Sequence, residues 1–332
     1  MNAAIQTQSE IQVTDLRPTP DDIRRDTLIG LARSPKRLSS KYFYDARGSQ
    51  LFEAITREPE YYLTRTEIAL MEARIGEIAD AIGANAHVVE YGSGSGLKTR
   101  LLLEALADPV AYTPIEISRS ALVGSVERLS EEFPAIEMLP VCADFTKPVA
   151  LPMPARTAQH TLVFFPGSTL GNFTDAEAVI LLRAMRETLC AHGSPEQGEA
   201  LIGIDLQKDP ALIEAAYNDA AGVTAEFTLN LLARLNREIG SNFDLHAFRH
   251  RAFYDAIEGR IETFLISQRE QVVTIGVQQF SFAKDEPMQV EYSRKYTDAG
   301  FAALATQAGL AVSKAWDDPR HWFGVRLLHP ID

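Results

Sequence analysis

The chain has 332 residues, of which 46% are hydrophobic and 23% are charged, and its formal net charge is −13. This composition is typical of a globular protein with one large or two medium domains. The acidic balance argues against nucleic acid or an anionic membrane as a partner, because both bind basic surfaces. No apolar run reaches the roughly 18 residues of a membrane span, and residues 1–15 do not resemble a secretory signal. We therefore expect a cytoplasmic protein.

Side chains that commonly bind metals show no clustering. The seven histidines are scattered, and no His/Cys group has the spacing of a metal site. Cys142 and Cys190 lie far apart in apolar segments, which predicts free, buried thiols in a reducing compartment. We expect no bound metal.

Residues 1 to about 35 are polar and contain several prolines, so we expect them to be only partly ordered, with residues 1–12 as a flexible N-terminus. From residue 87 to about 206, short apolar strands alternate with helices, which predicts a doubly wound α/β sheet of buried parallel strands. The predicted strands are His87–Tyr91, Tyr112–Ile117, Ile136–Cys142, Thr161–Phe165 and Ala200–Leu206. The predicted helices include Ser118–Glu132 and Asp175–Cys190, the second of which begins with a capping box at 174–177.

The pattern changes after Leu206. Residues 209–235 predict a long helical region, and residues 260–282 predict two or three antiparallel strands, which would interrupt or cap the α/β domain. Residues 299–308 then predict a helix. Two final strands, at 311–316 and 322–328, would close the sheet in antiparallel fashion.

The most informative segment is Gly92-Ser93-Gly94-Ser95-Gly96-Leu97-Lys98, which lies between the first of these strands and a helical stretch at 99–107. Alternate glycines let the backbone turn sharply and approach a ligand, and the helix that follows directs free N–H groups toward it. Leu97 stands where a dinucleotide-binding loop has its third glycine, and Glu90 before the loop would repel a pyrophosphate but suits a cationic ligand. The loop resembles motif I of S-adenosylmethionine-dependent methyltransferases. A plain tight turn and a nicotinamide dehydrogenase remain as alternatives.

Five further strings resemble one family of such methyltransferases. They are Lys41–Phe52, Ile55–Glu67, Phe165–Phe173, Asp219–Thr224 and Glu291–Tyr296. Together they closely resemble the histidine-specific Nα-methyltransferases of ergothioneine biosynthesis, from about residue 36 to the C-terminus.

The resemblance implies an α/β fold, with a Rossmann-like class I methyltransferase sheet and a second, α+β substrate-binding domain. The methyltransferase domain would comprise residues 66–207 plus 295–332, and the substrate-binding domain residues 13–65 plus 208–294. Members of the family trimethylate the α-amino group of L-histidine to hercynine with three S-adenosylmethionine molecules, the first step of ergothioneine biosynthesis. L-histidine and its mono- and dimethyl forms would be ligands, and we expect a monomer.

Cofactor residues follow from the loop and from the resemblance. Gly92 and Gly94 would admit the methionine portion, and Lys98 would reach its carboxylate, unless Lys98 is only a solvated first-turn lysine. Glu116 would accept the ribose hydroxyls, although the family often has Asp there. The predicted adenine ligands are Asp144, through the exocyclic amine, and Phe145, by backbone and packing; Asp144 could instead be a plain turn cap.

Amino-acid residues depend more on the resemblance. Gly167 and Asn172 would hold the substrate backbone, and Tyr217 its carboxylate, although Tyr217 could instead be a core residue. The remaining predicted contacts are Tyr44 near the reacting amine, Tyr61 toward both cofactor and substrate, and Glu291 and Ser293 at the imidazole. Tyr44 and Asn172 are the predicted catalytic residues, in a direct displacement that needs no covalent intermediate.

Thr263 departs from the family, which usually has Met after the string Arg260-Ile261-Glu262. The smaller polar side chain would enlarge the pocket or alter the packing of the imidazole. Methylation of another amino acid, such as tyrosine or tryptophan, therefore stays open, as does a non-catalytic ligand-binding partner in the pathway.

Overall fold

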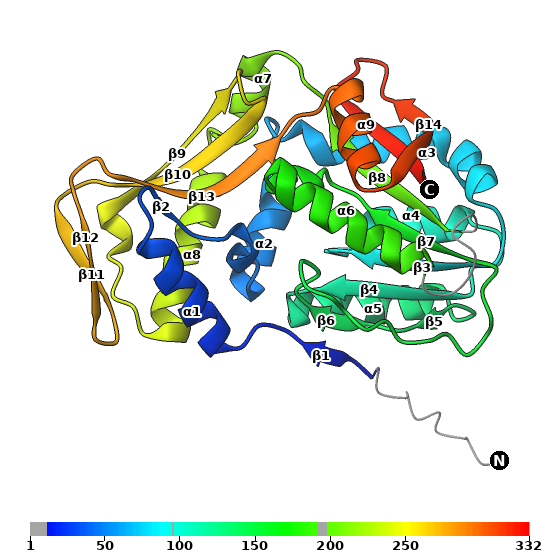
Figure 1. The fold of residues 1–332 in the computed structure, drawn as a ribbon, viewed down its shortest axis with the longest axis horizontal. Coiled ribbons are helices and arrows are strands. Elements are labelled where there is room, and N and C mark those ends of the chain that lie inside the picture. The colour runs from blue at the N-terminus through cyan, green and yellow to red at the C-terminus, as the bar shows by residue number, and fades with distance from the viewer. Residues whose placement is uncertain (1–11, 95, 191–197, 332) are drawn as a thin grey trace.

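The computed structural model describes residues 12–94, 96–190 and 198–331, which form two main sheets with helices around each (Figure 1). The larger sheet has nine strands in the order β1–β6–β4–β3–β7–β8–β15–β14, and β5 pairs with β4 at its side. Its strands are β1 (Thr14–Leu16), β3 (Ala86–Tyr91), β4 (Ala111–Glu116), β5 (Glu137–Met138), β6 (Val141–Ala143), β7 (His160–Phe165), β8 (Glu199–Asp205), β14 (Leu310–Asp317) and β15 (Phe323–Pro330). The first seven of these strands in the chain, β1 and β3 to β8, are parallel, and β15 runs antiparallel to both β8 and β14.

The strand order reverses between β3 and β7, which lie next to each other in the sheet. From β3 the chain moves outward through β4 to β6, and it then returns to β7 and continues to β8 on the other side. In a doubly wound sheet, ligands bind beyond the carboxyl ends of the strands at such a reversal. The glycine-rich loop follows β3 and Gly167 follows β7, so the fold brings both loops to this point. The predicted doubly wound α/β class is confirmed.

Helices cover both faces of the large sheet, because successive strand residues point to opposite sides. Val88 packs with one set of helices and Val89 with the other. The first set is α3 (Tyr62–Ile82), α4 (Leu97–Ala105) and α5 (Arg119–Glu132), and the second is α6 (Asp175–Cys190) and α9 (Asp298–Gln307). Helix α6 begins with the predicted capping box, in which Thr174 and Glu177 bond each other's backbone N–H groups.

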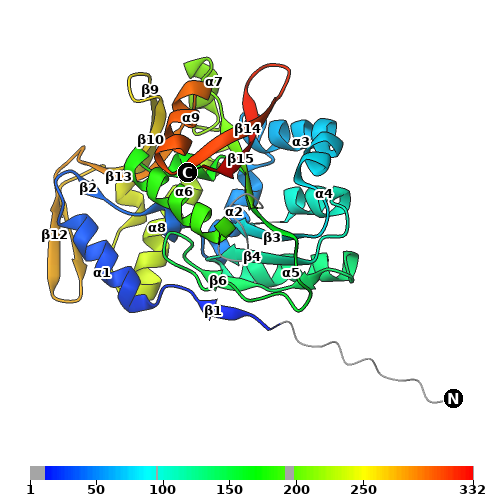
Figure 2. The same cartoon turned by 45° about the vertical axis from the view of Figure 1, so that its right-hand side comes forward.

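The second sheet has the order β2–β13–β10–β9 and lies to the left in Figure 1, with a separate hairpin, β11–β12, beyond it. Its strands and the hairpin are β2 (Lys36–Arg37), β9 (Phe248–Asp255), β10 (Arg260–Ser267), β11 (Gln271–Ile275), β12 (Gln278–Phe282) and β13 (Pro287–Arg294). The accompanying helices are α1 (Pro20–Leu31), α2 (Ala46–Ile55), α7 (Pro210–Ala215) and α8 (Val223–Ile239). Helix α8 packs against α1, α2 and β9 in a core of its own. Figure 2 shows α1 and α8 beside this sheet.

Several predictions about local structure were wrong. The N-terminal region contains β1, which pairs with β6, and α1, whose Thr19 and Asp22 form a capping box and whose Ile23 is buried. It is therefore ordered where the sequence predicted partial order; residues 1–11 lie outside the described residues. The predicted strand at 136–142 is two short strands, and the long helical region after residue 209 is α7 and α8, separated by a turn. Strand β9 was not predicted.

The predicted boundary after residue 65 falls inside α3, which runs unbroken from Tyr62 to Ile82. The core beside α8 draws on residues 23–63 and 213–290, whereas the cores of the large sheet draw on residues 70–206 and 296–328. We therefore keep the two-domain division as a proposal, with α3 as the connecting helix. Cys142 and Cys190 are both free; Cys142 is buried and Cys190 partly buried. Within the described residues, no helix has the length and apolar character needed to cross a membrane.

Candidate active site

A single cavity of about 780 Å³ lies at the strand reversal and extends from the glycine-rich loop to strand β13. Its size is within the range of small-molecule sites, about 300–1,000 Å³. The predicted site residues that line it are Tyr44, Tyr61, Gly92, Gly94, Lys98, Glu116, Asp144, Phe145, Gly167, Asn172 and Glu291. Tyr217, Thr263 and Ser293 do not line it and lie in the layer behind its wall. The fold therefore brings together residues from seven separate stretches of the chain.

The glycine-rich loop adopts backbone conformations that favour glycine. Gly92, Gly94 and Gly96 have φ angles of 75°, 50° and 74°, in the left-handed region. At Gly96 a side chain is also excluded by space, because a Cβ there would lie 2.5 Å from the hydroxyl of Ser125. The loop thus presents bare backbone to the cavity, as the approach of a ligand requires.

Glu90 lines the cavity and also has a structural role that was not predicted. Its carboxylate is buried beneath the loop and accepts hydrogen bonds from Thr99 of α4 and Tyr112 of β4, at 2.6 and 2.5 Å. Burial raises the pKa of Glu90 to about 8, although the two hydroxyl groups oppose the rise. Glu90 thus connects α4 and β4 beneath the loop, and burial favours its neutral form over the carboxylate.

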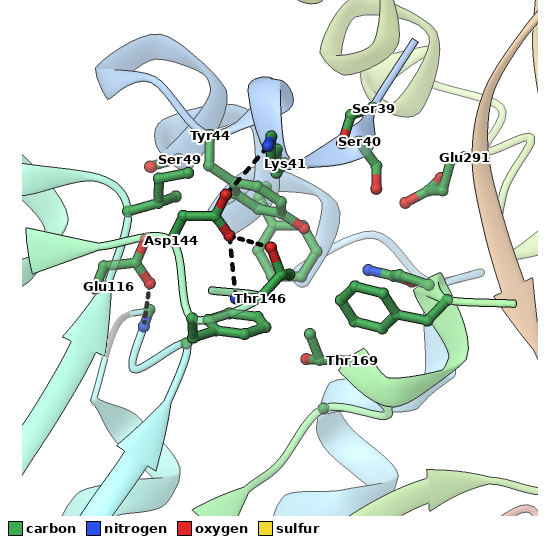
Figure 3. Close-up of a pocket in the computed structure, with 18 of the residues that line it drawn as sticks. Ser39, Ser40, Lys41, Tyr44, Ser49, Glu116, Asp144, Thr146, Thr169 and Glu291 are labelled. Atoms are coloured by element: carbon green, nitrogen blue, oxygen red, sulfur yellow. Dashed lines mark hydrogen bonds and ion pairs between the residues drawn. The ribbon is translucent and has the colours of Figure 1, made fainter. Parts of the chain in front are cut away.

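Two acidic residues stand at the ends of neighbouring strands (Figure 3). Glu116, at the end of β4, accepts the N–H of Gly94 at 3.2 Å and that of Ser118 at 2.9 Å, and burial raises its pKa. Asp144, after β6, accepts both the N–H and the hydroxyl of Thr146 through one oxygen, as a turn cap would. Its second oxygen faces the cavity side and pairs with Lys41 at 3.1 Å. The cap and ligand roles predicted as alternatives for Asp144 are therefore compatible.

Lys98 contacts a residue that was not predicted. Its ammonium lies 2.5 Å from the buried carboxylate of Glu67, on α3, which also accepts the N–H of Gly167 at 2.9 and 3.0 Å. Gly203 makes room for this carboxylate, because a Cβ there would lie 2.3 Å from it. Glu67 thus connects the glycine-rich loop with the loop after β7. Its only sequence signal was its place in one of the family-like strings, and the same is true of Lys41.

Aromatic rings line the middle of the cavity. Phe52 packs edge-on against Tyr44 and Tyr61, with ring centroids 5.8 and 6.2 Å apart. Burial first, and then the nearby Glu291 and other tyrosines, raise the pKa values of Tyr44 and Tyr61 well above the usual range. Both phenols therefore remain protonated at neutral pH, which suits them to donate hydrogen bonds and not to act as anionic bases.

Glu291 lies opposite Glu116 and Asp144 across the cavity (Figure 3). The pairing of β10 with β13 is irregular just before Glu291, so that Val290 has no partner on β10. Val290 and Glu291 both line the cavity. Burial raises the pKa of Glu291 to about 7, against the opposing effects of Lys295 and the hydroxyl of Thr263, which lies 3.4 Å away. Thr263 is fully buried behind this carboxylate and does not itself line the cavity, so its direct contact in the site is with Glu291.

A buried group of polar side chains lies behind the amino-acid end of the cavity. Tyr217 and Ser293 bond each other at 2.6 Å, and both accept from Lys295 at 2.9 Å. The ring of Tyr217 packs edge-on against that of Tyr61, which lines the cavity. Tyr217 is therefore neither a plain core residue nor an exposed ligand, and Lys295 was not predicted. Asn172 lines the cavity from the short 3₁₀ helix Thr169–Asn172.

The residues present fit S-adenosylmethionine. The bare loop, the acids at the ends of β4 and β6, and the cation of Lys98 match the methionine, ribose, adenine and carboxylate groups of that molecule. No three His, Cys, Asp or Glu side chains in the described ranges are grouped so that they could hold a metal ion.

Comparisons with known proteins agree with this geometry. Residues 23–330 match a family described as histidine-specific, S-adenosylmethionine-dependent methyltransferases. The chain is 40% identical over 312 residues to the histidine N-alpha-methyltransferase of Mycolicibacterium smegmatis, with 92% of this chain and 94% of that protein covered. It is 30% identical over 338 residues to ergothioneine biosynthesis protein 1 of Neurospora crassa, with 97% and 37% covered. It is 26% identical over 303 residues to 4-dimethylallyltryptophan N-methyltransferase of Aspergillus fumigatus, with 87% and 88% covered. The chain therefore belongs to the family of histidine-specific methyltransferases that use S-adenosylmethionine.

Proposed function

We propose that this enzyme trimethylates the α-amino group of L-histidine to hercynine, the first step of ergothioneine biosynthesis. The observation that carries the proposal is the single cavity that joins Gly92, Glu116 and Asp144 to Asn172 and Glu291. A methyl donor bound at the first group and an amino acid bound at the second would share one cavity. The mono- and dimethyl forms of histidine would bind in the same place.

S-adenosylmethionine supplies an electrophilic methyl group on its sulfonium. The chain's own contribution is to align a neutral amine with that methyl group and to exclude water. The amide of Asn172 can donate to the substrate carboxylate and accept from the amine, which orients the nitrogen. Glu291 can accept from an imidazole N–H. Since its pKa is about 7, close to that of imidazole, a proton shared between the two costs little.

The amine must lose a proton before each transfer. Tyr44 and Tyr61 are neutral phenols, so either could relay this proton to water: its oxygen accepts the proton from the amine as its own O–H proton passes on, and it ends as a neutral phenol again. The product ammonium is permanently charged. The faces of Tyr44, Phe52 and Tyr61 surround this part of the cavity and can stabilise a quaternary ammonium.

Mass spectrometry of L-histidine incubated with the enzyme and S-adenosylmethionine tests the function. We expect a gain of three methyl groups on the α-nitrogen. In Asn172→Ala, histidine affinity should fall by about tenfold or more, the effect of losing one or two hydrogen bonds, while affinity for S-adenosylhomocysteine stays the same. Asn242→Ala is the matched control, because Asn242 is exposed and lies outside the cavity lining. Unchanged histidine affinity in Asn172→Ala would show that Asn172 does not bind the substrate.

A second candidate is Nα-methylation of another aromatic amino acid. It is favoured by Thr263 at the place where the family usually has Met, since Thr263 alters the surroundings of Glu291. The chain's similarity to an N-methyltransferase named for a tryptophan derivative agrees with some freedom at this end of the pocket. If the enzyme methylates tyrosine or tryptophan faster than histidine at equal concentrations, this candidate is favoured. If it methylates no amino acid, a non-catalytic ligand-binding protein is favoured instead.

A further inference from the structure

Glu67 is buried on α3 behind the cavity wall, and three neighbours fix the position of its carboxylate. Both of its oxygens accept the N–H of Gly167, at 2.9 and 3.0 Å, and the second also accepts the ammonium of Lys98 at 2.5 Å. A Cβ at Gly203 would lie 2.3 Å from the first oxygen, so the carboxylate fills the space that this glycine leaves. Glu67 is therefore an anchored acceptor for Lys98.

Lys98 lies between this carboxylate and the cavity. Its side chain lines the cavity and is 17% exposed, whereas that of Glu67 is 1% exposed. The ammonium has three N–H donors, and among the described residues Glu67 is its one hydrogen-bond partner. Gly167 has no side chain to cover the ammonium, since a Cβ there would lie 3.3 Å from it. A carboxylate that binds from the cavity therefore meets an ammonium that already has an anionic partner.

The other charge that acts on Lys98 does not replace Glu67. Among the described residues, Glu67 is the one carboxylate within 4.0 Å of the ammonium. Glu90 also interacts with Lys98, which lowers its pKa, but burial is the larger effect and raises that pKa to about 8, so that the neutral form of Glu90 is favoured. Glu67 is therefore the anion that balances Lys98 before a ligand binds.

We propose that Glu67 is a positioning residue that competes with the cofactor's carboxylate for Lys98, and that it thereby keeps the spent cofactor exchangeable between methyl transfers. The proposal rests on the proposed function, in which Lys98 binds the methionine carboxylate and three cofactor molecules are used for each product. Two anions on one ammonium repel each other, so each weakens the attraction of the ammonium for the other. A spent cofactor that had Lys98 to itself would leave more slowly.

A purely structural role for Glu67 predicts a different pattern. Glu67 also holds the loop after β7, which continues to Thr169 and Asn172 in the cavity lining. If this were its whole contribution, Glu67→Gln would weaken every ligand at the cofactor end alike, with or without a carboxylate. Competition for Lys98 instead predicts a gain confined to ligands that carry a carboxylate.

The test compares S-adenosylhomocysteine with its decarboxylated analogue, which lacks only the carboxylate, by calorimetric titration. In Glu67→Gln the preference for S-adenosylhomocysteine should rise by about tenfold or more over that of the wild type, because the ligand becomes the sole anionic partner of Lys98. Dissociation of S-adenosylhomocysteine relative to the analogue, followed by stopped-flow displacement, should slow by a similar factor. Glu72→Gln is the matched control, since Glu72 is exposed on the same helix and lies outside the cavity lining. An unchanged or smaller preference in Glu67→Gln would overturn the proposal.

A second pair of variants covers the case in which Glu67→Gln fails to fold. Lys98→Met leaves Glu67 as an unpaired anion beside the ligand's carboxylate, whereas adding Glu67→Gln removes both charges, a change that buried ion pairs often tolerate. The preference for S-adenosylhomocysteine should therefore be about tenfold higher in the double variant than in Lys98→Met, and an equal or lower preference would contradict competition. A wild-type enzyme that does not methylate histidine would instead refute the proposed function, without changing this comparison of binding.

Discussion

Replacing Glu291 with glutamine should make the stability of the protein depend less on pH. Burial raises the pKa of Glu291 in the folded chain from the usual 4.5 to about 7. The unfolded chain therefore releases this proton at lower pH than the folded chain, and the free energy of unfolding falls as the pH rises through this interval. With about 1.4 kcal/mol for each unit of pKa, the loss between about pH 6 and about pH 8.5 amounts to roughly 1.4 kcal/mol. The glutamine variant lacks this loss.

Urea denaturation of both proteins over this pH range measures the effect. The difference in free energy of unfolding, Glu291→Gln minus wild type, should grow by about 1.4 kcal/mol and level off above about pH 8. All other titrating groups are common to both proteins and cancel. Thr263→Val should shift the transition to higher pH, because it removes a hydroxyl that lowers the pKa of Glu291. A difference that stays constant with pH would show that Glu291 is not a buried carboxyl of raised pKa.

Two further substitutions test the cofactor end. Gly96→Ala should weaken binding of S-adenosylmethionine and cost roughly 1–3 kcal/mol of stability, because Gly96 has a positive φ and a Cβ there would approach Ser125. The control Gly76→Ala, in open space on helix α3, should be neutral or slightly stabilising. Equal effects of the two substitutions, measured by calorimetry and thermal unfolding, would contradict this. Asp144→Asn should lower affinity for S-adenosylmethionine by about tenfold to a hundredfold, because an amide cannot accept hydrogen bonds from both Lys41 and an adenine amine as the carboxylate can. Histidine affinity should be unchanged. An equal loss of affinity for both ligands would point to a general disturbance of the cavity.

Local patterns in the sequence were enough to predict the large sheet and the loop that identifies the cofactor. Continuous apolar runs such as 161–165 form strands buried on both faces whatever lies around them, and β7 was predicted to within one residue. The glycines at 92, 94 and 96 are needed by the backbone itself, since all three have positive φ. These features depend on neighbouring residues in the chain, so they can be read from it.

Long-range contacts decided the rest. The pairing of Lys41 with Asp144 joins residues 103 positions apart, and that of Lys98 with Glu67 depends on the space left by Gly203. Neither leaves a local pattern, because any exposed helix or turn can carry a lysine or a glutamate.

The electrostatic character of the site also came only from the tertiary structure. Glu90 and Glu291 are ordinary acids in the sequence, and they acquire pKa values of about 8 and about 7 because the folded chain removes water from them. Lys295 lies in a string that resembled the family, yet its contacts with Asp205 and Tyr217 depend on the convergence of β8, β13 and the segment after α7 at one buried point. The sequence by itself therefore determined the class of fold and of cofactor, through periodicity and backbone freedom. The tertiary structure alone decided which charges meet and what surrounds them, because burial and distance are properties of the folded chain.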